Sequence, residues 1–162
     1  MRWVQSDLRE YFASKEYIDT ALVPLVKISF SSDSEISGND YKYIQLLAER
    51  LEQQLKGRIL LLPALVYFNS FPDEQIKSMI TSWKEELLNE GFRHIFFLST
   101  DSTYLNIIAD QYTELLYVAS IPLTHLEANH LQSIIDYQIE KLWPQIINRW
   151  QSKDNRENNQ II

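Results

Sequence analysis

The side chains with the most obvious chemistry lie in four loops, each of which directly follows a stretch of apolar residues. They include carboxylates and a histidine, which are common metal ligands and acid–base groups in enzymes. In an open parallel sheet the carboxyl ends of the strands meet at one edge, and ligands bind there. One interpretation of these loops is therefore a polar ligand-binding patch formed by Asp33, Glu35, Asp101 and His125.

Helix capping is the alternative explanation for these loops, and it is the one we favour. Ser, Thr, Asp and Asn side chains accept hydrogen bonds from the free N–H groups at a helix start, and each loop leads into an expected helix. Asp73 and Thr124 are candidate caps, and Thr124 with Glu127 has the spacing of a capping box. We accordingly assign no catalytic residue, and an enzymatic role is less favoured than a binding role.

Standard motifs for metals, cofactors and nucleotides are absent from the sequence. The chain has no cysteine, which excludes disulfides, thiolate metal sites and a cysteine nucleophile. Its three glycines are too few for a dinucleotide fingerprint or a P-loop, because Gly57 and Gly91 are placed to end helices. His125 and His130 are five residues apart and share no helix face. We therefore predict no resident metal and no cofactor.

The charge balance narrows the range of partners. There are 22 acidic and 15 basic residues, which give a net charge of −7. This charge disfavours non-specific binding to nucleic acid or to anionic lipid. No apolar run approaches the ~20 residues of a membrane span, and the first residues do not resemble a signal peptide. We expect a cytoplasmic protein that binds no nucleic acid and does not insert into membranes.

The elements that position the loops alternate between short apolar strands and amphipathic helices. This alternation is the pattern of parallel βαβ units, and strands that are apolar throughout are covered on both faces. We predict an α/β fold with three layers (αβα) and a mostly parallel sheet of about four strands, creatininase-like or flavodoxin-like. The expected strands span residues 20–30, 58–68 with an interruption at Pro63, 94–98 and 115–119, and the expected helices span residues 6–14, 39–56, 73–89, 101–109 and 124–150.

Two prolines and the polar C-terminal residues add detail to the predicted fold. Pro24 lies within the first strand and predicts a bulge or an edge position. Pro144 lies within the last helix and predicts a kink or two abutting helices. We expect residues 1–150 to form a single domain and residues 151–162 to form a flexible tail.

The last predicted helix has a broad apolar face on which Trp143 and Trp150, seven residues apart, lie together. Packing of this face against the sheet is one explanation. The other is an interface with a protein partner or with a second copy of the chain, since large aromatic side chains anchor interfaces. The first helix, with Trp3, Tyr11 and Phe12, raises the same question more faintly.

Five segments carry a family resemblance: residues 2–3 (RW), 15–21 (KEYIDTA), 56–64 (KGRILLLPA), 90–96 (EGFRHIF) and 121–123 (IPL). They resemble the YpiF family of uncharacterised proteins from Bacillus-type bacteria, over nearly the whole chain. The family carries no assigned activity. Its genes often lie near those of a menaquinol–cytochrome c reductase, which implies a role in respiratory-complex biogenesis by association only.

A second resemblance rests on residues 19–24 (DTALVP), 63–67 (PALVY) and 91–97 (GFRHIFF), which are similar to creatininase-type amidohydrolases. That family holds its metal with a Glu and a His after the first strand and a Gly-His-Gly-Gly-Asn loop after the third. Residues 29–35 and 99–104 stand at these places and contain no histidine. The resemblance therefore implies the fold without transferring a catalytic residue.

Two functions follow from these observations. The favoured one is a non-catalytic protein-interaction module, whose partner is another protein or a second copy in a homodimer. The alternative is a degenerate creatininase-like hydrolase or a small-molecule binder, with its site at the carboxyl ends of the strands.

Overall fold

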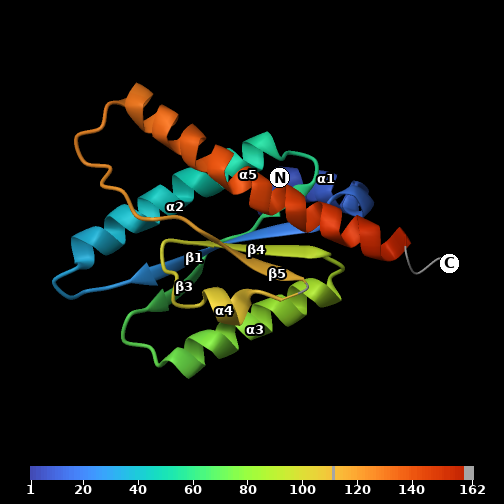
Figure 1. Ribbon diagram of the computed structural model, residues 1–162, viewed down its shortest axis with the longest axis horizontal. Coiled ribbons are helices and arrows are strands. Elements are labelled where there is room, and N and C mark those ends of the chain that lie inside the picture. Colours follow the sequence, from blue (N-terminus) through green and yellow to red (C-terminus); the bar gives the residue numbers. More distant parts are fainter. Residues whose placement is uncertain (111, 159–162) are drawn as a thin grey trace.

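The expected strands and helices occur in the expected order along the chain (Figure 1). The computed structural model describes residues 1–110 and 112–158, with the side chains of all of these except residues 107 and 153–158. The strands are β1 (Thr20–Ile28), β2 (Ile59–Leu61), β3 (Leu65–Phe68), β4 (His94–Ser99) and β5 (Thr113–Tyr117). The α-helices are α1 (Gln5–Ala13), α2 (Ser34–Gln54), α3 (Asp73–Asn89), α4 (Leu105–Ile108) and α5 (Ala128–Asn158), and a short 3₁₀ turn spans Lys15–Tyr17.

All the strands are parallel, and their order across the sheet is β2-β1-β4-β5. The short strand β3 continues the line of β2 and pairs with the second half of β1. Thr20 lies opposite Ile59 and His94 at one end of β1, and Ile28 lies opposite Phe68 at the other. The carboxyl ends of β1, β3, β4 and β5 therefore reach the same edge of the sheet.

Pro24 lies in the central strand, and the predicted edge position is wrong. Leu62 N–H donates to Leu22 C=O, and Asn69 N–H donates to Ile28 C=O, so the even-numbered residues of β1 turn their backbone groups toward β2 and β3. Pro24 has no N–H to offer on that side. The neighbouring strand is interrupted between β2 and β3 at this point, so no hydrogen bond is lost.

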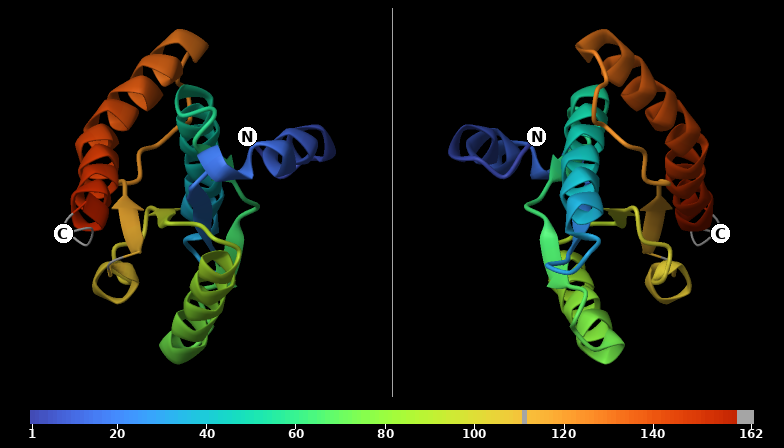
Figure 2. Two further views of the ribbon diagram at one scale, coloured as in Figure 1. Left: turned by 90° about the vertical axis from the view of Figure 1, so that its right-hand side faces the viewer. Right: turned by 90° about the vertical axis from the view of Figure 1, so that its left-hand side faces the viewer.

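Helices cover both faces of the sheet, so the predicted three-layer fold is confirmed. The helices α2 and α5 lie on one face, and α1, α3 and α4 lie on the other (Figure 2). Side chains of β1 alternate between the two cores: Leu22 and Val26 face α2 and α5, whereas Val23 and Leu25 face α3. Both faces of the central strands are buried, which is why their sequence is apolar throughout.

Helix ends differ most from the sequence-based expectation. The helix α2 begins at Ser34, so Gly38 lies in a helix and not in a loop. The helix α5 begins at Ala128, so the predicted capping box of Thr124 and Glu127 is wrong. His125 has a φ of 67°, which is incompatible with a helix at that residue. Gly57 and Gly91 have φ values of 98° and 96°, as expected for glycines that end helices.

The helix α5 passes Pro144 as one element, so the alternative of two abutting helices is wrong. It continues to Asn158, which places a helix in the first part of the predicted tail. The remaining residues of that tail, 159–162, lie outside the described residues. Within the described part of the chain, no helix has both the length and the apolar composition needed to cross a membrane.

Candidate functional site

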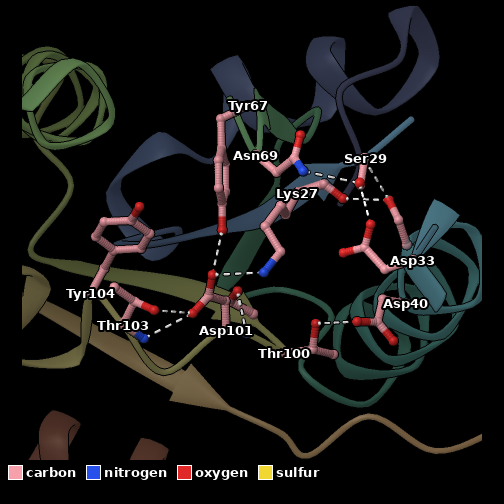
Figure 3. Close-up of polar contacts among 12 residues, drawn as sticks. Lys27, Ser29, Asp33, Asp40, Tyr67, Asn69, Thr100, Asp101, Thr103 and Tyr104 are labelled. Atoms are coloured by element: carbon pink, nitrogen blue, oxygen red, sulfur yellow. Dashed lines mark hydrogen bonds and ion pairs between the residues drawn. The ribbon is translucent and has the colours of Figure 1, made fainter. Parts of the chain in front are cut away.

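Polar side chains gather at the carboxyl edge of the sheet, where β1, β3 and β4 end (Figure 3). We call this group the strand-end cluster. Lys27 is the residue before the last of β1, and Tyr67 lies in β3. Its remaining members lie in the loops that follow β1, β3 and β4, and they are Ser29, Ser31, Asp33, Asn69, Asp101 and Thr103.

Asp101 is held from several sides. Its carboxylate accepts hydrogen bonds from Tyr67 Oη at 3.1 Å and Thr103 N at 2.9 Å, and Lys27 Nζ lies 3.3 Å away. Burial acts to raise the pKa of Asp101, but the Thr103 hydrogen bonds and the charge of Lys27 outweigh it and hold the pKa below its usual value. Burial raises the pKa of Tyr67, and the Asp101 carboxylate raises it further, so the phenol stays protonated and donates.

Asp33 forms the second half of the cluster. Its carboxylate accepts hydrogen bonds from the hydroxyls of Ser29 and Ser31, and the Ser29 bond is the largest cause of its lowered pKa. Asn69 Nδ2 donates to Ser29 Oγ at 3.0 Å and to Ser31 Oγ at 3.3 Å, which ties the end of β3 to the loop after β1. The Asp33 carboxylate thus stabilises the loop between β1 and α2 in which it lies.

The other two predicted site residues do not join the strand-end cluster. Glu35 is exposed and lines a hollow of about 350 Å³ beside the loop between β5 and α5. His125 is exposed in that loop. Among the described residues, no hydrogen bond or ion pair joins Glu35 or His125 to Asp33 or Asp101. No set of three described carboxylate or imidazole side chains has the spacing to hold a metal ion.

Three residues of this edge were missed from the sequence. Lys27 is the only charged residue of β1, and a lone charge near the end of an apolar strand was a usable signal. Tyr67 gave no such signal, because an aromatic residue in a strand is ordinarily core. Asp40 lies inside α2 and accepts hydrogen bonds from Thr100 and Ser120, which belong to loops after β4 and β5.

A second polar network lies at the opposite, amino end of the strands. Asp19 accepts two hydrogen bonds from Arg58, at 3.0 Å and 2.9 Å, and one from the hydroxyl of Thr20 at 2.7 Å. Trp150 Nε1 donates to Thr20 Oγ1 at 3.0 Å, and the Arg58 guanidinium lies 4.1 Å from the centre of the Trp150 ring. This network ties the second half of α5 to the sheet.

The predicted interface residues therefore take part in packing. Trp150 and Trp143 are both half-buried and contact the core between α5, α2 and the sheet. Of the two alternatives that the sequence left open, these contacts favour packing. An interface role for Trp143 and Trp150 stays a prediction.

A groove of about 550 Å³ lies between α1 and α3, at the β2 edge of the sheet. Trp3 and Phe12 form one wall, with 51% and 66% of their surfaces exposed. The other wall is one face of α3, where polar side chains recur every four residues. The lining side chains of that wall are Ser82, Glu86 and Glu90, and those of the floor are Tyr11, Leu60, Leu62, Trp83, Leu87 and Phe92. We call this the α1–α3 groove.

Comparison with known proteins places the chain in a family. The model of a family described as proteins of unknown function, DUF2487, matches residues 9–150. This chain belongs to the DUF2487 family. It is 32% identical over 152 residues to the Bacillus subtilis (strain 168) "Uncharacterized protein YpiF", a match that covers 93% of this chain and 98% of that protein. The predicted YpiF-family membership is confirmed, whereas no solved structure matches the chain significantly.

The strand-end cluster of this DUF2487 protein is internally paired. Asp101 is neutralised by Lys27, and Asp33 is bonded to two serines of its own loop. A ligand at this edge would have to displace these bonds, and a general base would have to give up its partners before it accepted a proton. The hydrogen bonds and the ion pair of the cluster therefore hold the strand-end loops together.

Replacing Lys27 by Met is expected to raise the pKa of Asp101 toward its usual value. The pair is partly exposed, so the free energy of unfolding at neutral pH should fall by only about 0.5–1 kcal/mol. Because the lowered pKa of Asp101 favours the folded state above the pKa of the unfolded chain, the loss should shrink as the pH falls through the Asp101 titration. Carboxyl titration by NMR measures the shift. An unchanged Asp101 pKa would contradict this account. The control is Lys77→Met, which removes an ion pair on the outer face of α3.

Proposed function

We propose that this chain is a non-catalytic, cytoplasmic protein-interaction module whose partner binds in the α1–α3 groove. The observation that carries the proposal is the pair of exposed aromatic side chains, Trp3 and Phe12, on the wall of an apolar groove. Large aromatic side chains beside an apolar hollow are typical of protein interfaces.

The charges at the groove indicate the chemistry of the partner. Glu86 and Glu90 lie on the α3 wall. Glu90 has a cation within the molecule, Lys15 Nζ at 3.2 Å, whereas no ion pair among the described side chains uses Glu86. A partner segment with apolar residues on one side and a Lys or Arg near Glu86 would complement both walls. An amphipathic basic helix has this pattern, and such helices bind in apolar grooves.

The acidic net charge supports the same class of partner. At −7, the chain attracts basic segments over a longer range than the groove itself. The family resemblance adds an expectation about identity, a component of respiratory-complex biogenesis, which the experiment below addresses directly.

The test begins with a photo-crosslinking amino acid in place of Phe12, introduced into the full chain in its own host. The matched control carries the same group in place of Tyr137, an exposed aromatic residue on α5. We expect one discrete crosslinked protein from position 12 and none in common with position 137. A subunit or assembly factor of a menaquinol–cytochrome c reductase would support the respiratory expectation.

Affinity measurements then test the groove itself. Phe12→Asp and Glu86→Lys should each weaken binding of the identified segment by about 10-fold or more, and Tyr137→Asp should leave it unchanged. If the groove variants stay folded and bind as tightly as the wild type, the proposal is wrong.

A second candidate function is a small-molecule site, or a degenerate creatininase-like hydrolase, at the strand-end cluster. It is supported by the gathering of Asp33 and Asp101 with Lys27 at one edge of the sheet, and the predicted site adds Glu35 and His125. Native mass spectrometry of protein purified gently from its host tests this candidate. A bound small molecule or metal that is lost in Asp101→Asn would favour it over the groove.

A further inference from the structure

The sheet has two edges, and most of their length is covered by other parts of the chain. At β5, Gln145 and Arg149 of α5 donate to the backbone carbonyls of Leu115 and Thr113. At β2, Leu61 N–H donates to Met1 C=O at 2.7 Å, and Trp3 N–H donates to Leu61 C=O at 3.1 Å. An exposed edge strand is a template for pairing with another chain, and these contacts block it.

The edge of β3 has no such cover among the described residues. In both views of Figure 2, β3 lies at the outer margin of the sheet, and no helix or strand lies alongside it on the side away from β1. The helix α1 lies near this edge only at the opposite, amino end of the strands (Figure 1). Pro63, which precedes β3, separates it from the covered edge of β2.

The backbone of Val66 faces outward from this edge. Asn69 N–H donates to Ile28 C=O at 2.9 Å, which turns the odd-numbered residues of this segment toward β1. Backbone groups alternate sides along a strand, so the N–H and C=O of Val66 point away from the sheet. Its side chain is also 38% exposed. Val66 therefore offers both a donor and an acceptor to an incoming strand.

Aromatic side chains gather around this edge. Phe30 is 86% exposed, and its ring centre lies 6.2 Å from that of Phe68, which in turn lies 5.3 Å from Phe71. The strand itself, Leu65–Phe68, contains no charged residue. Natural edge strands are usually protected by lysine, proline or a bulge, and β3 has none of these within it.

We propose that β3 pairs antiparallel with β3 of a second copy, about a two-fold axis that places Val66 opposite Val66 of that copy. The two valines would exchange N–H···O=C bonds, and the two aromatic groups of Phe30, Phe68 and Phe71 would be covered together. The sheet would then continue through the dimer.

The edge itself argues for a second copy as the occupant. A two-fold contact requires a surface complementary to itself. Two acidic molecules repel each other, but Leu65–Phe68 brings no like charges face to face. Covering Phe30 alone would remove on the order of 150–200 Å² from water in each copy, about a fifth of the roughly 800 Å² that a specific interface covers on each side.

Sedimentation of the purified full chain is the first test. We expect a dimer for the wild type and for Val66→Ile, which keeps the backbone donor. Val66→Pro removes only the outward N–H, so it should be a monomer with an unchanged circular dichroism spectrum. A monomeric wild type at the highest soluble concentration overturns the proposal, and so does a folded Val66→Pro variant that remains a dimer.

A crosslink keeps the proposal testable if Val66→Pro does not fold. The chain has no cysteine, so Val66→Cys introduces a single thiol. Residues opposite one another across paired strands lie within disulfide range. Mild oxidation should link Val66→Cys into covalent dimers and should leave Tyr137→Cys, on the exposed face of α5, monomeric. Equal yields from the two variants would overturn the proposal. A double variant with Phe12→Asp and Val66→Cys should crosslink as well as Val66→Cys alone. This result separates the β3 edge from the α1–α3 groove.

Discussion

Trp150→Ala is expected to lower the free energy of unfolding by about 3 kcal/mol. The indole packs against the core beneath α5, donates its N–H to Thr20 and lies against the Arg58 guanidinium. Alanine leaves a cavity and removes all three contacts. Chemical denaturation measures the loss, which should appear as a lower midpoint with little change in the slope.

Trp150→Phe is the matched control for this prediction. Phenylalanine keeps most of the ring packing and loses the N–H, so it should cost only about 1 kcal/mol. The interface prediction for Trp150 has the opposite consequence. If Trp150→Ala changed stability by less than about 0.5 kcal/mol and weakened an association, the packing explanation would be wrong.

Asp19→Asn is expected to lower the free energy of unfolding at neutral pH by about 2–3 kcal/mol. Its carboxylate side chain is only 18% exposed and receives two hydrogen bonds from Arg58. The two bonds go to different carboxylate oxygens and the amide has only one, so one bond would be lost and the Arg58 charge would be left uncompensated. We place the value below that for a fully buried pair because Arg58 is partly exposed.

The pH dependence of this variant has a definite sign. Burial acts to raise the pKa of Asp19, but the hydrogen bonds from Arg58 and Thr20 outweigh it, and the pKa lies below its usual value. The carboxylate therefore stabilises the folded state in full above the unfolded pKa of about 3.9. This contribution is lost as the pH falls through the folded pKa. The difference between wild type and Asp19→Asn should thus shrink below about pH 4.

Unfolding titrations at several pH values test both the size and the sign. Glu74→Gln is the control. Glu74 pairs with Lys77 on the outer face of α3, so this substitution should change the free energy of unfolding by less than about 0.5 kcal/mol. A difference between wild type and Asp19→Asn that grew on acidification would contradict the assigned direction of the Asp19 pKa.

The α1–α3 groove and the free edge of β3 lie on different parts of the molecule. The α1–α3 groove lies at the covered edge of β2, the free edge belongs to β3, and the strand-end cluster lies beyond the carboxyl ends of the strands. A partner in the groove and a second copy at β3 therefore use different residues, and single substitutions can separate the two associations.

Local patterns in the sequence were sufficient to predict most of the helices and strands. The helix α3 has the predicted bounds, because its apolar residues recur at helical spacing between Pro72 and Gly91. The alternation of apolar strands and amphipathic helices was likewise sufficient to predict the layered α/β fold. Periodicity reflects which faces are buried, and burial is what holds these elements in place.

The errors arose where distant residues act on the chain. Pro24 indicated an edge or a bulge, but the interruption between β2 and β3 admits it to the central strand. The start of α2 was missed because Ser37 Oγ donates to Lys27 C=O, a tie between the first turn of the helix and β1. Neither effect can be found in a local window of sequence.

The candidate site was likewise predicted from the sequence only in part. Residue types and the rule for parallel sheets located the polar edge and two of its carboxylates, Asp33 and Asp101, from the sequence. Only the folded chain showed that Lys27 and Tyr67 hold Asp101, and that Trp150 lies against Arg58. Such pairings join residues tens of positions apart, and they form when the sheet sets the order of its strands. Composition and spacing describe each strand alone, whereas its neighbours are chosen by packing of the whole domain.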